Sequence, residues 1–156
     1  MLEMVRFDLR NGDDLALFTE TSAAYYAEVC TAEECAEEIA DLHDARLTRQ
    51  LIAQTLCEDT PYFIMKIMAD DAFAGFAAYT VDPIRGRGFI NNFYVAKEYR
   101  GRGLGREACA MVEKHMSDSG AAYIALEPVE AAEAFWCSLG YGAASSGLWE
   151  KRLAAA

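Results

Sequence analysis

The amino-acid sequence predicts a mixed α/β (α+β) fold, with a mixed, mostly antiparallel sheet flanked by helices. Three observations support this prediction. Short β-branched and aromatic runs alternate with longer segments of helical period, two of these runs are joined by a tight turn, and a glycine-rich turn separates another run from a helix. The predicted order is β-α-α-β-β-β-α-β-α-β. At this length, the chain is predicted to be a single domain over 1–156.

The N-terminal third is predicted to hold one strand and two helices. The strand spans 4–10, where apolar and polar residues alternate. A helix follows to about residue 29, and Thr31 with Glu34 forms a capping box that starts the next helix. The apolar stripe of that helix loses its register after residue 42, which leaves a break near Asp44 open. The strand residues expected to face the core are Val5, Phe7 and Leu9.

The middle of the chain is predicted to be a β-hairpin. Its strands span 62–68 and 72–81, and Asp70-Asp71 makes the turn. Gly75, inside the second strand, indicates a bulge or the close approach of another backbone.

A strand at 88–95 and a helix from about 104 come next. The remaining elements are a short strand at 123–126, a helix at 130–139 that ends before Gly140, and a last strand at 148–153.

The glycine-rich turn at 100–105 has the features of an anion-binding site. It stands where the helix from about 104 should begin, and a helix N-terminus leaves backbone N–H groups unpaired at the positive end of its dipole. Glycines there let a ligand come close to the backbone. The chain carries a net charge of −11, yet the stretch from 85 to 106 around this turn is basic. Its charged residues are Arg85, Arg87, Lys97, Glu98, Arg100, Arg102 and Arg106.

Two common phosphate motifs do not fit this turn. Arg106 stands where the dinucleotide fingerprint has its third glycine, and the Gly-Lys-Ser/Thr of a P-loop occurs nowhere. The spacing Arg-x-x-Gly-x-Gly, at Arg100, Gly103 and Gly105, resembles the acetyl-CoA pyrophosphate loop of the GCN5-related N-acetyltransferase (GNAT) superfamily. The segment 95–99 and the predicted order of elements resemble that family too. A basic surface turn without a ligand is the other interpretation.

The resemblance implies a GNAT-like fold and a binding mode for acetyl-CoA. In this family the strand before the loop separates from its neighbour, and the pantetheine arm pairs with the exposed strand backbone. Here Phe93 and Val95 would supply those backbone groups, with Tyr94 beside them. The Val95 N–H would polarise the thioester carbonyl and hold the oxyanion. The residues implied to hold the pyrophosphate are Arg100, Gly101, Arg102, Gly103, Leu104, Gly105 and Arg106.

The later family pattern is Asn-x-x-Ala-x-x-x-Tyr-x-x-x-Gly-Phe. Its Ala-to-Gly spacing is kept at Ala132 and Gly140, Tyr141 is a mild change from Phe, and two other positions depart. Val129 replaces the Asn that would bond the pantetheine, and Trp136 replaces the Tyr that often protonates the CoA thiolate. Trp136 is implied to lie against the cofactor, although a packing role beside Phe135 stays open. Because an indole N–H is no useful acid near pH 7, water or another group is expected to protonate the thiolate.

The resemblance leaves the general base open. Some family members use a Glu on the strand before the loop, where this chain has Asn91 and Asn92. An amide cannot act as a base, but Asn92 could hold a water or the substrate. Glu127 is the nearest plausible carboxylate, with an ordinary strand-end acid as the other interpretation. Where the family's acceptor pocket would be walled, the chain has Tyr25, Tyr26 and Glu28.

The function implied is an acyl-CoA-dependent N-acyltransferase that moves acetyl from acetyl-CoA to a primary amine. The acceptor is expected to be a small amine or an exposed protein or peptide amino group. The alternative is a non-catalytic acyl-CoA-binding regulatory module. A further alternative is a generic α+β domain with a basic turn.

Composition narrows the partners and the location. The acidic charge argues against nucleic acid as a partner. No apolar run reaches the ~18 residues of a membrane span and no signal peptide is visible, so a cytoplasmic location without membrane contact is expected. The 5 cysteines form no C-x-x-C pair and no zinc spacing, so no metal is expected. A homodimer is left open.

Overall fold

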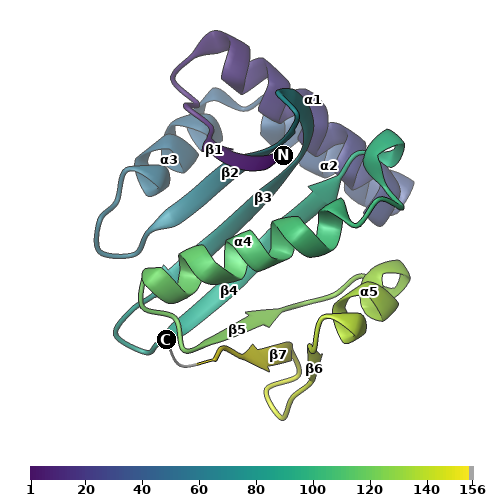
Figure 1. Ribbon diagram of the computed structural model, residues 1–156. Helices are drawn as coiled ribbons and strands as arrows, with labels where there is room; N and C mark the ends of the chain where they lie inside the picture. Colours follow the sequence, from purple (N-terminus) through teal and green to yellow (C-terminus); the bar gives the residue numbers. More distant parts are fainter. Residues whose placement is uncertain (155–156) are drawn as a thin grey trace.

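A computed structural model describes residues 1–154, which form a central sheet with helices on both faces (Figure 1). Within this range, seven strands pair in the order β1-β2-β3-β4-β5-β7-β6. Every neighbouring pair is antiparallel except β4 and β5, which run parallel. The predicted mixed, mostly antiparallel sheet flanked by helices is therefore confirmed.

The elements have the following bounds. The strands are β1 (Leu2–Arg6), β2 (Tyr62–Ala69), β3 (Ala72–Asp82), β4 (Arg87–Val95), β5 (Tyr123–Leu126), β6 (Gly142–Ala143) and β7 (Trp149–Arg152). The helices are α1 (Gly12–Val29), α2 (Ala32–Leu42), α3 (Ala45–Thr55), α4 (Leu104–Asp118) and α5 (Glu133–Ser138), with short 3-10 turns η1 (Lys97–Tyr99) and η2 (Glu130–Ala132).

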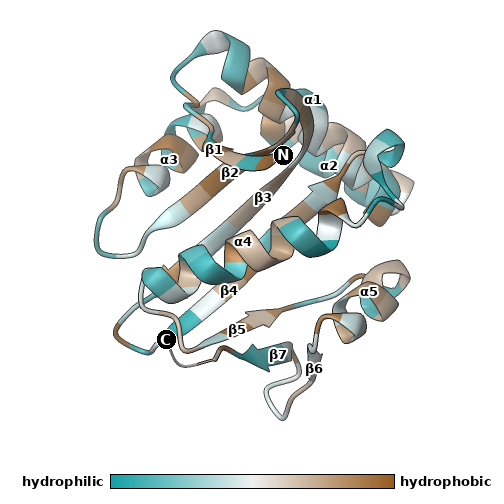
Figure 2. Ribbon diagram, in the orientation of Figure 1, coloured by the Kyte–Doolittle hydropathy of each residue, from teal (hydrophilic) through white to brown (hydrophobic). Residues whose placement is uncertain are grey.

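Two cores lie on the opposite faces of the sheet. Helix α4 covers one face, where Val112 packs among Tyr79 and Ile124, all essentially inaccessible to solvent. Helices α1, α2 and α3 cover the other face, where the ring of Phe18 meets the ring of Phe76 edge-on. Burying one such side chain stabilises the fold by about 1.5–3 kcal/mol. Figure 2 shows β2 as largely hydrophobic and α4 as a mixture of hydrophobic and hydrophilic residues.

Local signals explain where the helices begin. The capping box is present as predicted, because the Thr31 side chain accepts from the Glu34 N–H and the Glu34 carboxylate accepts from the Thr31 N–H. The helical region also breaks near Asp44, whose side chain caps α3 by accepting from two backbone N–H groups. Among residues 1–154, no helix is both long and apolar enough to cross a membrane.

The hairpin prediction is confirmed. Asp70 and Asp71 take positive φ values of 49° and 68°, as a tight turn between β2 and β3 requires. At Gly75, an added Cβ would lie 2.0 Å from the carbonyl oxygen of Tyr94, so β4 approaches this position too closely for any side chain. The close approach predicted from the glycine is therefore present.

The first strand differs from the prediction. It spans Leu2–Arg6 rather than 4–10, and Val5 remains 38% exposed. Phe7 and Leu9 are buried as expected, but they lie beyond the strand. Pairing with β2 continues only to Arg6, and one further bond joins the Phe7 N–H to Ile64 before the chain turns. The apolar alternation therefore predicted the burial of Phe7 and Leu9 correctly, but it was wrong for Val5 and for the point where the ladder ends.

The C-terminal part has more elements than predicted. The expected helix at 130–139 divides into η2 and α5, and a two-residue strand, β6, pairs with β7. A strand this short carries no period-2 pattern, so the sequence offered no signal for it.

Candidate active site

The parallel pair β4 and β5 opens into a cleft. Their pairing runs only from Arg87–Tyr123 to Ile90–Leu126. Just beyond, the register of β4 against β3 jumps from Asn92 to Ile90, so Asn91 is the extra residue of a β-bulge. Bulges bend the strand that carries them. The last residues of β4 therefore diverge from β5, and a cleft of about 730 Å³ occupies the gap.

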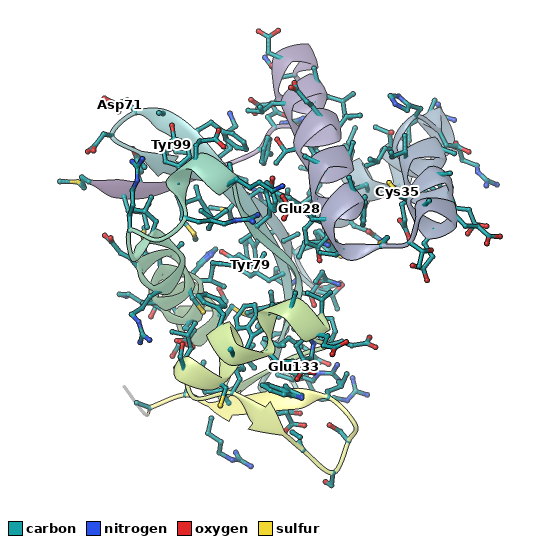
Figure 3. The ribbon with its side chains drawn as sticks, turned by 90° about the vertical axis from the view of Figure 1, so that its right-hand side faces the viewer. Glu28, Cys35, Asp71, Tyr79, Tyr99 and Glu133 are labelled. Carbon is teal, nitrogen blue, oxygen red and sulfur yellow. The ribbon has the colours of Figure 1, made fainter. Side chains whose placement is uncertain are left out.

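The cleft is lined by four parts of the chain. These are the end of β4, the turn before α4, the segment from the end of β5 to α5, and the last turns of α1. Figure 3 shows Glu28 on α1 facing the segment that carries Tyr99, with Glu133 of α5 on the opposite side of the opening.

The turn before α4 presents unpaired backbone amides. Gly101 and Gly103 take φ values of 77° and 78°, in the left-handed region that favours glycine, and an added Cβ at either would meet nothing within 4 Å. In residues 1–154, none of the N–H groups of 101–106 donates a hydrogen bond. The Arg100 N–H is already donated to the carbonyl of Lys97, so the free donors begin at Gly101.

The side chains of this turn have separate roles. The Arg102 guanidinium lies over the Tyr99 ring, and Leu104 packs into the core beneath α4. Neither residue lines the cleft, whereas Gly101, Gly103 and Gly105 do. Arg106 does line it and reaches across to α5, where its guanidinium donates to the backbone and hydroxyl oxygens of Ser138 at 3.5 and 3.4 Å.

The edge of β4 from which β5 diverges also presents backbone groups to the cleft. The Ala96 N–H points toward β3, where it donates to the Ala74 carbonyl at 2.8 Å. Since backbone groups alternate in direction along a strand, those of Val95 and Phe93 point the opposite way, toward the cleft. The Val95 carbonyl there accepts from Arg100 Nε at 2.7 Å. The N–H of Val95 faces the cleft on the same edge.

An aromatic wall stands opposite this edge. The Phe93 ring stacks on Phe135 at 6.0 Å between centroids and meets Trp136 at 5.6 Å. Trp136 lines the cleft, but it is only 7% exposed and also packs against Tyr141. The indole is therefore both part of the core and part of the cleft wall.

Two carboxylates on opposite walls have different surroundings. Glu127 follows the last residue of β5, is exposed and lines the cleft. Glu28, near the end of α1, accepts from Arg100 Nη2 at 2.8 Å and from the Tyr94 hydroxyl at 3.3 Å. Burial raises the pKa of Tyr94, and the negative charge of Glu28 adds to that rise.

Asn92 lies on the α1 side of the cleft, beside Tyr25. Burial raises the pKa of the Tyr25 hydroxyl, and the polar side chain of Asn92 offsets part of the rise. Asn92 and Glu127 thus line the same cleft from different walls. Tyr26 does not line it, and burial raises the pKa of that hydroxyl to about 12.

Some cleft residues could not be singled out in advance. Ser138 and Phe135 reach the cleft because α5 packs against the start of α4, where an added Cβ on Gly105 would lie 3.2 Å from the Phe135 ring. The pairing of Glu28 with Arg100 joins residues 72 positions apart and leaves no local pattern.

The split sheet and the glycine turn at the start of α4 define the fold of an acetyltransferase. The sequence model of the Acetyltransferase (GNAT) family matches residues 23–141. The chain belongs to this family. No curated protein sequence matches the chain.

Solved structures share the fold. The PaiA N-acetyltransferase of Thermoplasma acidophilum, in complex with coenzyme A, matches with a TM-score of 0.73 and 16% identity over 98% of this chain and 99% of that one. A putative acetyltransferase of the GNAT family from Desulfovibrio desulfuricans matches with a TM-score of 0.71 and 18% identity, over 99% of this chain and 100% of that one. The ribosomal-protein-S18-alanine N-acetyltransferase of Escherichia coli matches with a TM-score of 0.59 and 18% identity, over 96% of this chain and 89% of that one.

Proposed function

We propose that this protein transfers the acetyl group of acetyl-CoA to a primary amine, by direct attack within a ternary complex. The observation that carries the proposal is the run of unpaired amides at 101–106, which stands beside the open edge of β4 in one cleft. Family membership supports acyl-CoA-dependent N-acetyltransfer in general. The binding mode, the mechanism and the acceptor are proposals.

Acetyl-CoA would bind along the cleft in two parts. Its pyrophosphate would accept hydrogen bonds from the amides of 101–106, at the positive end of α4. Its pantetheine arm would pair with the backbone of Phe93 and Val95, as an added strand pairs with an exposed edge. Tyr94 would lie beside that arm, and Trp136 with Phe135 would supply an apolar wall.

The reaction needs a neutral amine and a stabilised oxyanion. The amine nitrogen attacks the thioester carbonyl carbon, a C–N bond forms, and the C–S bond then breaks to release CoA as a thiolate. The Val95 N–H would hold the developing oxyanion, a contribution of about 3–4 kcal/mol for one such donor. A thiolate whose parent thiol has a pKa near ~8.5 leaves readily and takes its proton from water.

The proton of the amine goes to a base. An ammonium group with a pKa of ~10.4 must first lose a proton, at a cost of about 4–5 kcal/mol near pH 7. We assign this role to Glu127, which lines the cleft from the end of β5. Asn92 would hold the bridging water or the acceptor from the α1 wall.

Two acceptor classes fit, and both enter on the side of Tyr25 and Glu28. One is a small amine. The other is an exposed amino group of a protein or peptide, an acceptor class suggested by the similarity of the fold to the ribosomal-protein-S18-alanine N-acetyltransferase.

A non-catalytic acyl-CoA-binding module is the second candidate. Val129 stands where the family pattern has an Asn, and the buried Trp136 stands where it has a Tyr that could act as an acid. The missing acid at Trp136 favours binding without turnover, whereas Val129 removes one pantetheine contact of the family pattern.

The test combines binding with turnover. Titration calorimetry would measure CoA affinity, and CoA released from acetyl-CoA would be quantified with 1,4-diaminobutane, lysine amide and an N-terminal alanyl peptide as acceptors. Chromatography should be used rather than a thiol reagent, because Cys57 and Cys137 are exposed and would react. CoA release that requires one of these acceptors supports the proposed acetyltransferase. Tight CoA binding without turnover on any acceptor supports the module, and absence of CoA binding contradicts both.

A further inference from the structure

The peptide bond between Val95 and Ala96 is held from both sides. On the β3 side, the Ala96 N–H donates to the Ala74 carbonyl at 2.8 Å. On the cleft side, the Val95 carbonyl accepts from Arg100 Nε at 2.7 Å. Strand β5 has already diverged from β4 at this point. The Arg100 side chain therefore occupies the position that a neighbouring strand would otherwise fill.

Arg100 is itself held by Glu28, which comes from a different layer of the fold. Arg100 Nη2 donates to Glu28 Oε2 at 2.8 Å, and the Arg100 guanidinium lies over the Tyr94 ring at 5.4 Å. The Tyr94 hydroxyl donates to the other oxygen, Glu28 Oε1, at 3.3 Å. Val95, Arg100, Glu28 and Tyr94 thus form a closed circuit of contacts. The circuit ties the end of α1 to the end of β4.

The circuit limits what the Glu28 carboxylate can do. Each of its oxygens already accepts a hydrogen bond from the protein, and its side chain is 26% exposed. The circuit adjoins the Val95 N–H, which belongs to the peptide unit between Tyr94 and Val95, directly before the 95–96 unit that is held from both sides. A shift of the 95–96 peptide would rotate this donor relative to a thioester in the cleft.

We propose that Glu28 is a positioning residue for acetyl transfer, acting through Arg100 to orient the end of β4. The inference rests on the proposed function, because it concerns the alignment of the donor that would hold the oxyanion. Glu28 neither takes the proton of the amine nor binds its charge. Misplacing a reacting group by about 1 Å costs up to ~100-fold in rate. Loss of the Glu28 contacts, which leaves Arg100 bonded to the Val95 carbonyl alone, is therefore expected to lower the rate roughly tenfold.

Two substitutions separate positioning from chemistry. Glu28→Ala removes both hydrogen bonds. Glu28→Gln retains both, because the Gln carbonyl can accept from Arg100 while its amide donates to the Tyr94 oxygen. Glu20→Ala is the matched control, since Glu20 is an exposed acid on the same helix with no hydrogen bond or ion pair among the residues that the structure describes.

Two readouts are needed. The first is the rate at which acetyl-CoA releases CoA, measured over a range of pH, as its acetyl group passes to the best acceptor of the panel or to water. The second is the rate of hydrogen exchange at the Ala96 amide, which measures without any substrate how firmly the 95–96 peptide is held. Glu28→Ala should lower the rate about tenfold and speed the exchange about tenfold, with CoA affinity within about threefold. Glu28→Gln and Glu20→Ala should stay near wild type in both.

Three results would overturn the inference. One is a Glu28→Ala variant with wild-type rate and wild-type exchange. Another is a Glu28→Gln variant as slow as Glu28→Ala, because the charge would then matter rather than the geometry. The third is a Glu28→Ala variant that only melts earlier, which would indicate a structural role. A wild-type protein that never binds CoA would instead defeat the proposed function, while the Ala96 exchange would still test the clamp.

Discussion

Replacing Gly103 by Asp tests the phosphate loop most directly. Gly103 stands at the start of α4 with φ at +78°, and an added Cβ would meet no atom within 4 Å. Asp and Asn are the side chains that best tolerate this backbone region, so both variants are expected to fold. In both variants, the new side-chain oxygen could also accept hydrogen bonds from the first N–H groups of α4. The pair Gly103→Asp and Gly103→Asn therefore differs essentially in one negative charge.

The magnitude follows from Coulomb's law. A carboxylate about 5 Å from one phosphate charge, at an effective dielectric constant of about 20–40, costs about 2–3 kcal/mol, or roughly 30- to 150-fold in affinity. A fully charged pyrophosphate would raise this cost further. The Gly103→Asn variant carries only the strain of the side chain, so its affinity for CoA should fall far less.

Titration calorimetry with CoA at low salt would measure the difference. The gap between the Asp and Asn variants should narrow as salt is added, because both charges face solvent. Thermal denaturation of both variants provides the control for folding. Equal CoA affinity in the two variants, at every salt concentration, would refute the placement of the pyrophosphate on the amides of 101–106.

Three further predictions concern strand β3, the general base and the half-buried His115. Gly75→Ala should lower stability by about 1–3 kcal/mol because its Cβ would strike the Tyr94 carbonyl, whereas Gly142→Ala, with nothing within 4 Å, should melt like wild type. Glu127→Gln should lower kcat about 100-fold near pH 7 and less at high pH, where free amine is abundant; an unaltered pH–rate profile would remove Glu127 as the base. Burial lowers the pKa of His115, so the folded state resists its protonation and stability should fall as pH drops below about 6.5. His115→Gln should flatten that fall in Tm, and an equally steep fall in the variant would contradict the assignment.

The sequence carried most of the fold through local signals. The capping box at Thr31, the turn at Asp70-Asp71 and the glycines of the loop before α4 all appear where their patterns predicted. These signals work because capping, turn geometry and helix period depend on residues within a few positions of one another. The family resemblance was carried by the same kind of short spacing, and the family match bears it out.

The contacts that shape the candidate site were beyond such signals. The bulge at Asn91 depends on how β4 meets β3, and the open edge depends on where β5 leaves β4. The early end of β1 depends likewise on its pairing with β2.

The sequence by itself therefore determined the order of the main strands and helices and the glycine turn at the head of α4, but not the short strand β6 or the end of β1. Only the tertiary structure decided that the free amides share a cleft with the open edge of β4, and that Glu28 holds Arg100 across 72 positions of chain. The physical reason is distance along the chain. Periodicity and turn chemistry are read from neighbours, whereas a strand edge or a paired charge exists only once remote segments have packed together.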